Sequence, residues 1–384
     1  MNPGASHPTL RRPNPPGHAA ASTAPLRLIH PLLALLVVLA IPTTPTSSAQ
    51  PKGAEQLSRA VRPAPRPPAT PAALAATNPS VAPLQIQVGP YAGWDRCFTL
   101  SNGRVEALVV PDIGRIQQFR WAGENSPFWE DPALHGHPPD PDSTEWRNFG
   151  GDKAWPAPQS DWPRLTPRAW PPPAAFDAMP VTLSVRRDTV IMTSPVDPHY
   201  GIRIQREIHL PSGAPSMTVR TTFEKVEGPP VTVSVWIVTQ LRHPVAVFAP
   251  IPERSLFPEG YNRQSGEALP SDLAVERGLL SLTRDPRRST KIGLDTDRLL
   301  WVGTDQALLI ESPRLRGASY PDHDSSAEIY TNPDPKTYIE LEMLGPLRRI
   351  GPGESLSQTN TYTLLRRPPG SDPEAFARKT FRIP

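Results

Sequence analysis

The chain has 384 residues, enough for one large or two ordinary domains, and a single cysteine, Cys97, which excludes an intramolecular disulfide and a cysteine-based metal site. The chain has 40 Lys/Arg and 37 Asp/Glu residues. Residues 1–83 contain seven of the basic residues and one of the acidic residues, so the rest of the chain has 33 basic and 36 acidic residues. This slight acidic excess excludes the basic face that a nucleic-acid-binding domain needs.

The first 49 residues have the order of a secretory signal peptide. Arginines precede the apolar run LLALLVVLAI (32–41), and Ser47 and Ala49 stand at positions −3 and −1 of a cleavage site. The run is shorter than the roughly 20 residues that span a bilayer. We therefore predict an exported protein, periplasmic or extracellular, with no stable membrane span after signal cleavage. An uncleaved N-terminal anchor is the alternative.

The rest of the chain divides into a linker, a domain and a tail. Residues 50–83 are rich in Pro and Ala without an apolar period, which predicts a disordered, extended linker. Short alternating runs begin at residue 84, so we expect one domain over 84–368. A C-terminal tail follows over 369–384, and its DPEAFARKT stretch can form a short helix.

Alternation of apolar and polar residues predicts about a dozen strands in this domain. The Asn102-Gly103 pair marks a hairpin within 96–110, because Asn-Gly favours a two-residue turn. The other predicted strands are 115–121, 181–187, 189–194, 202–210, 216–224, 230–240, 298–303, 307–312, 327–331, 336–344 and 357–365. The Trp- and Pro-rich segment 122–180 is predicted to be irregular. No helices alternate with the strands and no fixed-period repeat indicates a propeller, so the fold class is an all-β, large two-sheet sandwich.

Two of these strands pair an apolar face with a polar and aromatic face, because side chains alternate along a strand. In VTVSVWIVTQ (231–240), Trp236 and Gln240 lie opposite the valines. In TYIELEM (337–343), Glu340 and Glu342 share one face, about 6.5–7 Å apart from the rise per residue. Carboxylates paired in a desolvated cleft shift each other's pKa, and one can act as general base. A solvated face paired with arginines is the alternative.

The segment NFGGDKAWPAPQSDWP (148–163) has almost no aliphatic residue but two tryptophans. A tryptophan ring suits stacking on a pyranose, so we predict that Trp155 and Trp162 include one ligand contact and one structural residue. Asp152 and Lys153 are candidates for hydrogen bonds to sugar hydroxyls. The alternative is that the tryptophans only pin an irregular loop and that Asp152 and Lys153 pair with each other or with neighbouring residues.

Three segments resemble the galactose-mutarotase-like (aldose 1-epimerase-like) superfamily: NGRVEALVVPDIGRIQQFRW, IQREIHLPSGAPSMTVRTTFEKVEGPPVTVSVW and YIELEMLGPLRRIGPGESLSQTNTYTL. The motif GG-x-K-x-W-x-A-P-Q lies between the first and second of these segments. Together the four features make the chain similar, over roughly 90–366, to a bacterial family of unknown function in this superfamily. The resemblance implies a β-supersandwich with a carbohydrate site on its concave face.

The resemblance also implies site residues. Aldose mutarotases use a glutamate as general base on the anomeric hydroxyl, which corresponds to Glu342 or Glu340, with Glu342 preferred. The substrate-binding arginine corresponds to Arg115, whose expected partner is a glutamate of the site, since a buried arginine needs one. The glycine-rich turn corresponds to the Gly150-Gly151 pair with Lys153 and Trp155.

The mutarotase histidine, a general acid on the ring oxygen, has no counterpart. The corresponding strand contains VWIVTQ, and His243 lies beyond its end. A neutral Gln240 cannot be a general acid, so His243 is a candidate only by proximity.

We therefore expect a carbohydrate- or glycan-binding protein that acts, if it is an enzyme, at an anomeric centre. A non-catalytic glycan-binding or structural cell-envelope protein is the alternative. No cofactor or metal is predicted: the histidine pair in LHGHPPDPD and the aspartates of YPDHDSS offer too few ligands.

Overall fold

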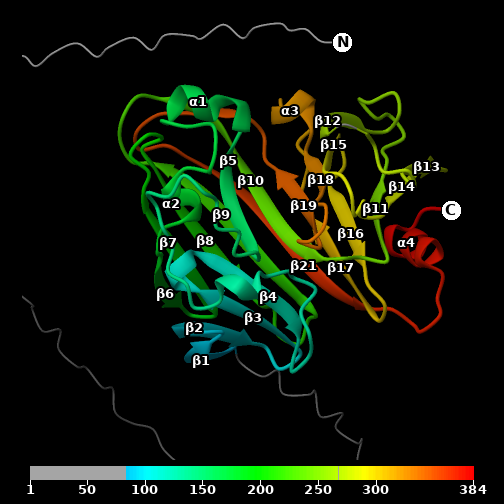
Figure 1. Cartoon of the computed structure of the whole chain (residues 1–384), viewed down its shortest axis with the longest axis horizontal. Helices are drawn as coiled ribbons and strands as arrows, with labels where there is room; N and C mark the ends of the chain where they lie inside the picture. The colour runs from blue at the N-terminus through cyan, green and yellow to red at the C-terminus, as the bar shows by residue number, and fades with distance from the viewer. Residues whose placement is uncertain (1–83, 267) are drawn as a thin grey trace, which may run out of the picture. The chain divides into compact units, whose positions relative to one another are not determined.

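The computed structural model describes residues 84–266 and 268–384, which fold into two large antiparallel sheets (Figure 1). This confirms the predicted all-β sandwich. The predicted signal peptide (1–49) and linker (50–83) lie outside the described residues.

The first sheet has eleven strands. Their order along the sheet is β1 (Gln85–Tyr91), β2 (Trp94–Ser101), β3 (Val105–Val110), β4 (Arg115–Trp121), β5 (Asp152–Ala157), β10 (Val231–Arg242), β19 (Tyr338–Leu344), β18 (Ala327–Thr331), β15 (Thr290–Leu294) and β12 (Asn262–Gly266). The eleventh, β20 (Arg348–Ile350), pairs with the beginning of β10. The long strand β10 and its neighbour β19 lie at the centre of this sheet.

The second sheet has ten strands. Their order is β13 (Ala274–Glu276), β14 (Leu279–Leu282), β11 (Ala246–Pro250), β16 (Arg298–Val302), β17 (Gln306–Glu311), β21 (Ser355–Arg366), β9 (Ser216–Lys225), β8 (Ile202–His209), β7 (Thr189–Val196) and β6 (Thr182–Arg186).

Helical segments in the described residues are short. They are η1 (Pro111–Ile113), η2 (Pro132–Leu134), η3 (Gln159–Asp161), α1 (Trp162–Leu165), α2 (Ala174–Asp177), α3 (Pro321–Asp324) and α4 (Pro373–Phe381). The last of these is the helix predicted in the C-terminal tail, and it buries Ala377 and Phe381 against a cluster that includes Phe248 of β11. No helix of the described ranges has the length and apolar character to cross a membrane.

The main hydrophobic core lies between the two sheets. On β19, Ile339, Leu341 and Met343 are buried in this core, as predicted from their alternation. Burying a side chain of this size stabilises the fold by roughly 1.5–3 kcal/mol. Glu340 and Glu342, at the intervening positions, consequently lie on the outer face of the first sheet.

The predicted hairpin at Asn102-Gly103 joins β2 to β3. Gly103 has a φ of +82°, which a glycine adopts without a steric penalty. The Asn102 side-chain oxygen accepts the backbone N–H groups of Arg104 and Val105, and its amide donates to the backbone oxygen of Pro211 at 2.6 Å. The turn is therefore tied to the connection between β8 and β9 of the second sheet.

The prediction of irregular structure for 122–180 is wrong at β5, which lies between β4 and β10. All six residues of β5 are buried. A strand buried on both faces shows no apolar-polar alternation, so its sequence lacks the signal by which half-buried strands are recognised.

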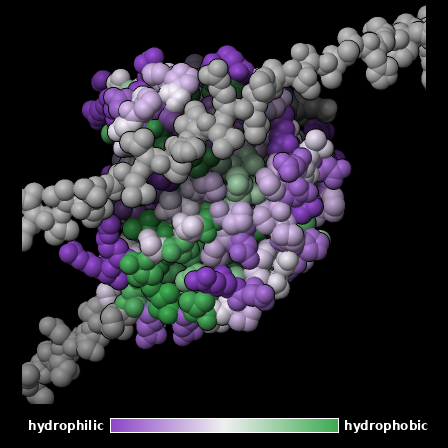
Figure 2. All heavy atoms as spheres, turned by 90° about the vertical axis from the view of Figure 1, so that its left-hand side faces the viewer, coloured by the Kyte–Doolittle hydropathy of each residue, from purple (hydrophilic) through white to green (hydrophobic). Residues whose placement is uncertain are grey.

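The sheet edges β1 and β6 expose apolar side chains. Figure 1 shows both strands at its left, and Figure 2, which faces that side, shows hydrophobic residues gathered there. Val88 of β1 is 59% exposed and Val185 of β6 is 52% exposed. The exposed Arg186 and Arg187 at the end of β6 place charge on this edge, which disfavours pairing with a further strand.

Candidate functional site

A cavity of about 220 Å³ lies on the outer face of the first sheet. Four tryptophans form much of its wall: Trp146, Trp155, Trp170 and Trp236. The other lining residues are polar or aromatic: Gln159, Ser265, Lys291, Tyr330, Tyr338, Glu340 and Glu342. The cavity thus combines rigid aromatic walls with a small set of charged and hydrogen-bonding groups, which is typical of a ligand site.

Strand register brings the predicted site residues together. Trp155 of β5 is paired with Trp236 of β10, and their rings meet edge to face at 5.2 Å. Gln240 of β10 is paired with Glu340 of β19. Three segments that are far apart in the sequence therefore converge on one surface, and the face predicted for β10 and β19 is the face that holds the cavity.

The Gly-Gly pair allows a loop to cross the beginning of β5. Gly150 has a φ of +84°, and a Cβ there would lie 2.2 Å from the backbone oxygen of Trp129. That oxygen accepts the N–H of Gly151 at 2.9 Å, while the Trp129 N–H donates to the backbone oxygen of Gln240. The two glycines thus permit a close backbone approach that holds β5 beside β10.

Glu342 is fully buried and is held by two donors on one carboxylate oxygen. Its Oε2 accepts the indole N–H of Trp236 at 2.5 Å and lies 2.8 Å from the Lys291 ammonium. The Lys291 ammonium also pairs with Glu328 at 2.7 Å and lies 4.2 Å from the centre of the Trp236 ring. Burial lowers the pKa of Lys291, but the two carboxylates outweigh it and raise the pKa above its ordinary value. Lys291 is thus a fixed positive charge.

The second oxygen of Glu342 is free. Among the described residues, Glu342 Oε1 has no hydrogen-bond partner although it is buried. Buried polar atoms are almost always hydrogen-bonded, so such an atom in a cavity wall indicates a place for a ligand donor.

Glu340 has a different environment on the same strand. Its Oε1 accepts the side-chain amide of Gln240 at 2.7 Å. Burial and the nearby Glu342 carboxylate raise the pKa of Glu340 to about 7, against the lowering effect of the Lys153 ammonium. Glu340 can therefore carry a proton near neutral pH.

Lys153 lies next to the cavity but does not line it. Its ammonium is buried, has no hydrogen-bond partner among the described residues, and lies 5.0 Å from the ring centre of Trp155 and 5.8 Å from that of Trp146. Burial lowers the pKa of Lys153 to about 8, while the Glu340 carboxylate raises it. Its charge acts on the cavity through Glu340 and the tryptophan rings.

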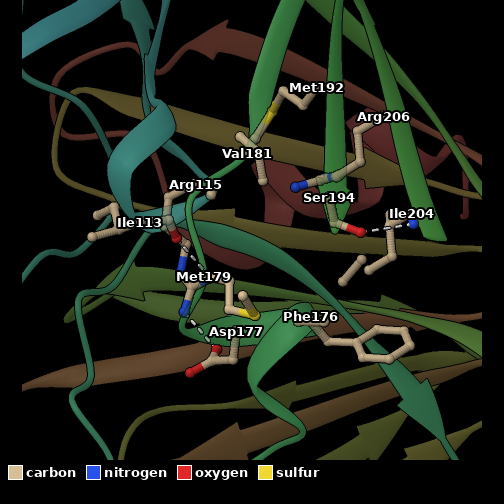
Figure 3. A pocket seen from close by; sticks show the side chains of 13 residues that line it. Ile113, Arg115, Phe176, Asp177, Met179, Val181, Met192, Ser194, Ile204 and Arg206 are labelled. Carbon is tan, nitrogen blue, oxygen red and sulfur yellow. Dashed lines mark hydrogen bonds and ion pairs between the residues drawn. The ribbon is translucent and has the colours of Figure 1, made fainter. Parts of the chain in front are cut away.

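Arg115 pairs with Asp177 instead of the glutamate that the sequence led us to expect (Figure 3). The guanidinium of Arg115, on β4, lies 2.5 Å from Asp177 at the end of α2, beside a small cavity of about 20 Å³. Asp177 also accepts the indole N–H groups of Trp155 and Trp146, each at 2.9 Å. Arg115 thus positions two walls of the main cavity through Asp177 and does not line that cavity itself.

Four other predicted residues do not line the cavity, and one of them is Gln240, whose side-chain amide donates to Glu340. Asp152 projects between the sheets, where it pairs with Arg206 and accepts the Tyr362 hydroxyl at 2.6 Å. Since Lys153 faces the outer side, its neighbour Asp152 must face the core. Trp162 is fully buried and donates its N–H to the backbone oxygen of Pro156, so it is the structural member of the predicted tryptophan pair. His243 is exposed, outside the cavity wall, and accepts a hydrogen bond from Arg284.

Several lining residues were not predicted from the sequence, chiefly Trp146, Trp170, Lys291 and Tyr330. Tyr338 lies on the face of β19 that its alternation with the glutamates predicts. Lys291 lies on β15, whose sequence TKIGL has no alternation that predicts a strand.

The fold is similar to that of solved mutarotase-like β-sandwich proteins. A candidate aldose 1-epimerase from Klebsiella pneumoniae superposes with a TM-score of 0.51 at 11% identity, covering 78% of this chain and 87% of that one. A galactose mutarotase-like protein from Lactobacillus casei matches with a TM-score of 0.47 at 12% identity, covering 70% and 100%. A TPR-domain protein from Parabacteroides distasonis matches 75% of this chain, at 16% identity and a TM-score of 0.47. This chain spans only about half (51%) of that protein's length.

The chain belongs to the family described as Domain of unknown function (DUF4380), whose model matches residues 96–365. This confirms the predicted family of unknown function, and the likeness to the Klebsiella protein confirms the predicted mutarotase-like fold. The comparison with curated proteins gave no match.

Proposed function

We propose that this protein binds a sugar in the tryptophan-lined cavity and interconverts its anomers, with Glu342 as general base. The observation that carries the proposal is the Glu342 carboxylate: Oε2 is anchored by Trp236 and Lys291, and Oε1 has no partner among the described residues. A carboxylate oxygen held in this way is oriented to accept the proton of an anomeric hydroxyl.

Glu340 supplies the second proton transfer in this proposal. When Glu342 takes the hydroxyl proton, the bond between C1 and the ring oxygen breaks and the ring oxygen takes up a proton. Glu340, with a pKa of about 7, holds that proton in a good part of the molecules at neutral pH. Rotation about the C1–C2 bond and reversal of both transfers then closes the ring as the other anomer, and both carboxyl groups return to their starting states.

A non-catalytic glycan-binding protein is the second candidate. The observation in its favour is that no histidine lines the cavity within the described part of the chain, so the usual mutarotase acid is missing. In that case the tryptophans and the polar residues bind a sugar without proton transfer.

Two NMR experiments on the full chain test the proposal with a panel of monosaccharides and oligosaccharides. Saturation transfer detects binding, and exchange spectroscopy of the anomeric signals detects catalysis. Binding with accelerated exchange that Glu342→Gln abolishes supports the proposal. Binding without accelerated exchange supports the non-catalytic candidate, and no binding to any sugar refutes both.

We also propose that the mature protein is exported, on the basis of the N-terminal signal-peptide pattern alone. Its combination with a sugar-binding cavity would place the activity on glycans outside the cytoplasm.

A further inference from the structure

Trp170 differs from the other tryptophans around the cavity by its exposure. It is 41% exposed, whereas Trp155 and Trp236 are 3% exposed and Trp162 is fully buried. Trp170 nevertheless lines the cavity, so its ring lies at the mouth with one part toward the interior and one toward solvent. A large aromatic surface left in water at the mouth of a cavity indicates contact with a ligand that extends outward.

The ring of Trp170 is held in place by its neighbours. It stacks on Trp162 at 6.0 Å with an interplanar angle of 16°. Trp146 and Trp155 meet it edge to face at 5.0 Å and 5.9 Å. Trp162 is itself fixed by its hydrogen bond to the backbone of Pro156. The exposed ring is thus the outermost member of a packed aromatic cluster.

The loop that carries Trp170 is also constrained. The Thr166 hydroxyl donates to the backbone oxygens of Trp162 and Arg168, at 2.9 Å and 2.7 Å. The Arg168 guanidinium donates to the backbone oxygen of Ser143 at 2.6 Å. Prolines occupy 171–173, directly after Trp170, and fix the backbone φ there. A ring that is already in position loses little conformational freedom on binding, which favours affinity.

We infer that the ligand is an oligosaccharide whose reducing-end unit occupies the cavity while the next unit stacks on Trp170. This inference rests on the proposed function. Only the reducing-end unit of a glycan chain has a free anomeric hydroxyl, so it is the unit that reaches Glu342. The rest of the chain then leaves through the mouth, where Trp170 lies. The guanidinium of Arg168 is engaged with backbone oxygens, so this outer subsite is formed by an apolar ring and fits the C–H face of an uncharged sugar.

The test compares sugars that differ only in length, on the full chain. Glucose, galactose, mannose, xylose and N-acetylglucosamine are each measured against their β-1,4-linked di- and trisaccharides by calorimetry or ligand-observed NMR. We expect at least one series in which the disaccharide binds more tightly than the monosaccharide. Trp170→Ala should reduce the ratio of the two affinities roughly fivefold, since a stacking contact contributes about 1 kcal/mol.

Two further variants separate stacking from structural damage. Trp170→Phe keeps an aromatic ring and should retain most of the ratio, and Val88→Ala, at an exposed apolar position on the β1 edge, should leave it unchanged. Equal binding of monosaccharides and longer sugars, or equal weakening of both by Trp170→Ala, overturns this inference and leaves the proposed function standing. Binding of no sugar at all refutes the proposed function, and the inference with it.

Discussion

Replacing Glu340 by Gln removes a carboxyl group whose pKa is about 7 in the folded protein, against an ordinary value of 4.5. Between these two values the native protein holds a proton that the unfolded chain has released. The folded state therefore binds more protons than the unfolded state, and the free energy of unfolding falls as the pH rises through this window. The pKa of Glu340 in the folded state is about 2.5 units above its value in the unfolded chain. At about 1.4 kcal/mol per unit, this difference changes the free energy of unfolding by roughly 3 kcal/mol across the window.

Urea unfolding of the full chain at several pH values between about 4.5 and 8 measures this effect. Glu340→Gln cannot ionise, and its amide can still accept the Gln240 hydrogen bond. The stability of the wild type relative to this variant should fall by roughly 3 kcal/mol from the lower to the upper pH. Glu276→Gln, at an exposed position on β13, controls for the loss of a surface carboxyl. A wild-type-to-variant difference that does not depend on pH would refute the reasoning that burial raises the pKa of Glu340.

Three other predictions concern the support of the site and the leader. Lys291→Met removes the ammonium between two buried carboxylates and should lower the free energy of unfolding by roughly 3–5 kcal/mol in urea titrations; an unchanged value would show that the ion pairs contribute nothing. Gly150→Ala places a Cβ 2.2 Å from a backbone oxygen, whereas Gly103→Ala, at nearly the same φ, meets nothing within 4 Å. Gly150→Ala should therefore lower Tm by several degrees more than Gly103→Ala. Equal decreases in Tm would show that the destabilisation comes from the positive φ alone and not from the close backbone contact. Mass spectrometry of the protein secreted by its native host should find Gln50 at the N-terminus, and an intact residue 1 would contradict signal cleavage.

The alternation of residues on two strands was enough to predict the central part of the site. It placed Trp236 and Gln240 on one face of β10 and the two glutamates, Glu340 and Glu342, on one face of β19. The structure shows these faces side by side because β10 and β19 are neighbours in the first sheet. Period-two alternation is a strong signal wherever one face of a strand is buried in a core and the other is polar.

The same rule could have separated Asp152 from Lys153. Neighbours on a strand face opposite sides, so only one of them can lie at the outer face once β5 is recognised as a strand. The segment was predicted to be irregular, and both residues were consequently assigned to the site. The structure places Asp152 against Arg206 in the core and leaves Lys153 beside the cavity.

Other parts of the site depend on contacts that a single sequence does not encode locally. Arg115 and its partner Asp177 are separated by 62 positions, and nothing in the irregular segment indicates that α2 returns to β4. Lys291 contacts Glu342 only because β18 pairs with both β15 and β19. Charge pairs of this kind follow from sheet order, which propensity and alternation do not determine.

The proposed function requires that Glu342 removes the proton of the anomeric hydroxyl of a sugar bound in the cavity. Exchange NMR of the anomeric signals, with the full chain and with Glu342→Gln, tests it most directly. We expect accelerated exchange for the wild type and a loss of roughly 100-fold or more in the variant, with binding of the sugar retained, since a general base contributes about 10²–10⁴ to the rate. Accelerated exchange that survives the substitution would contradict it.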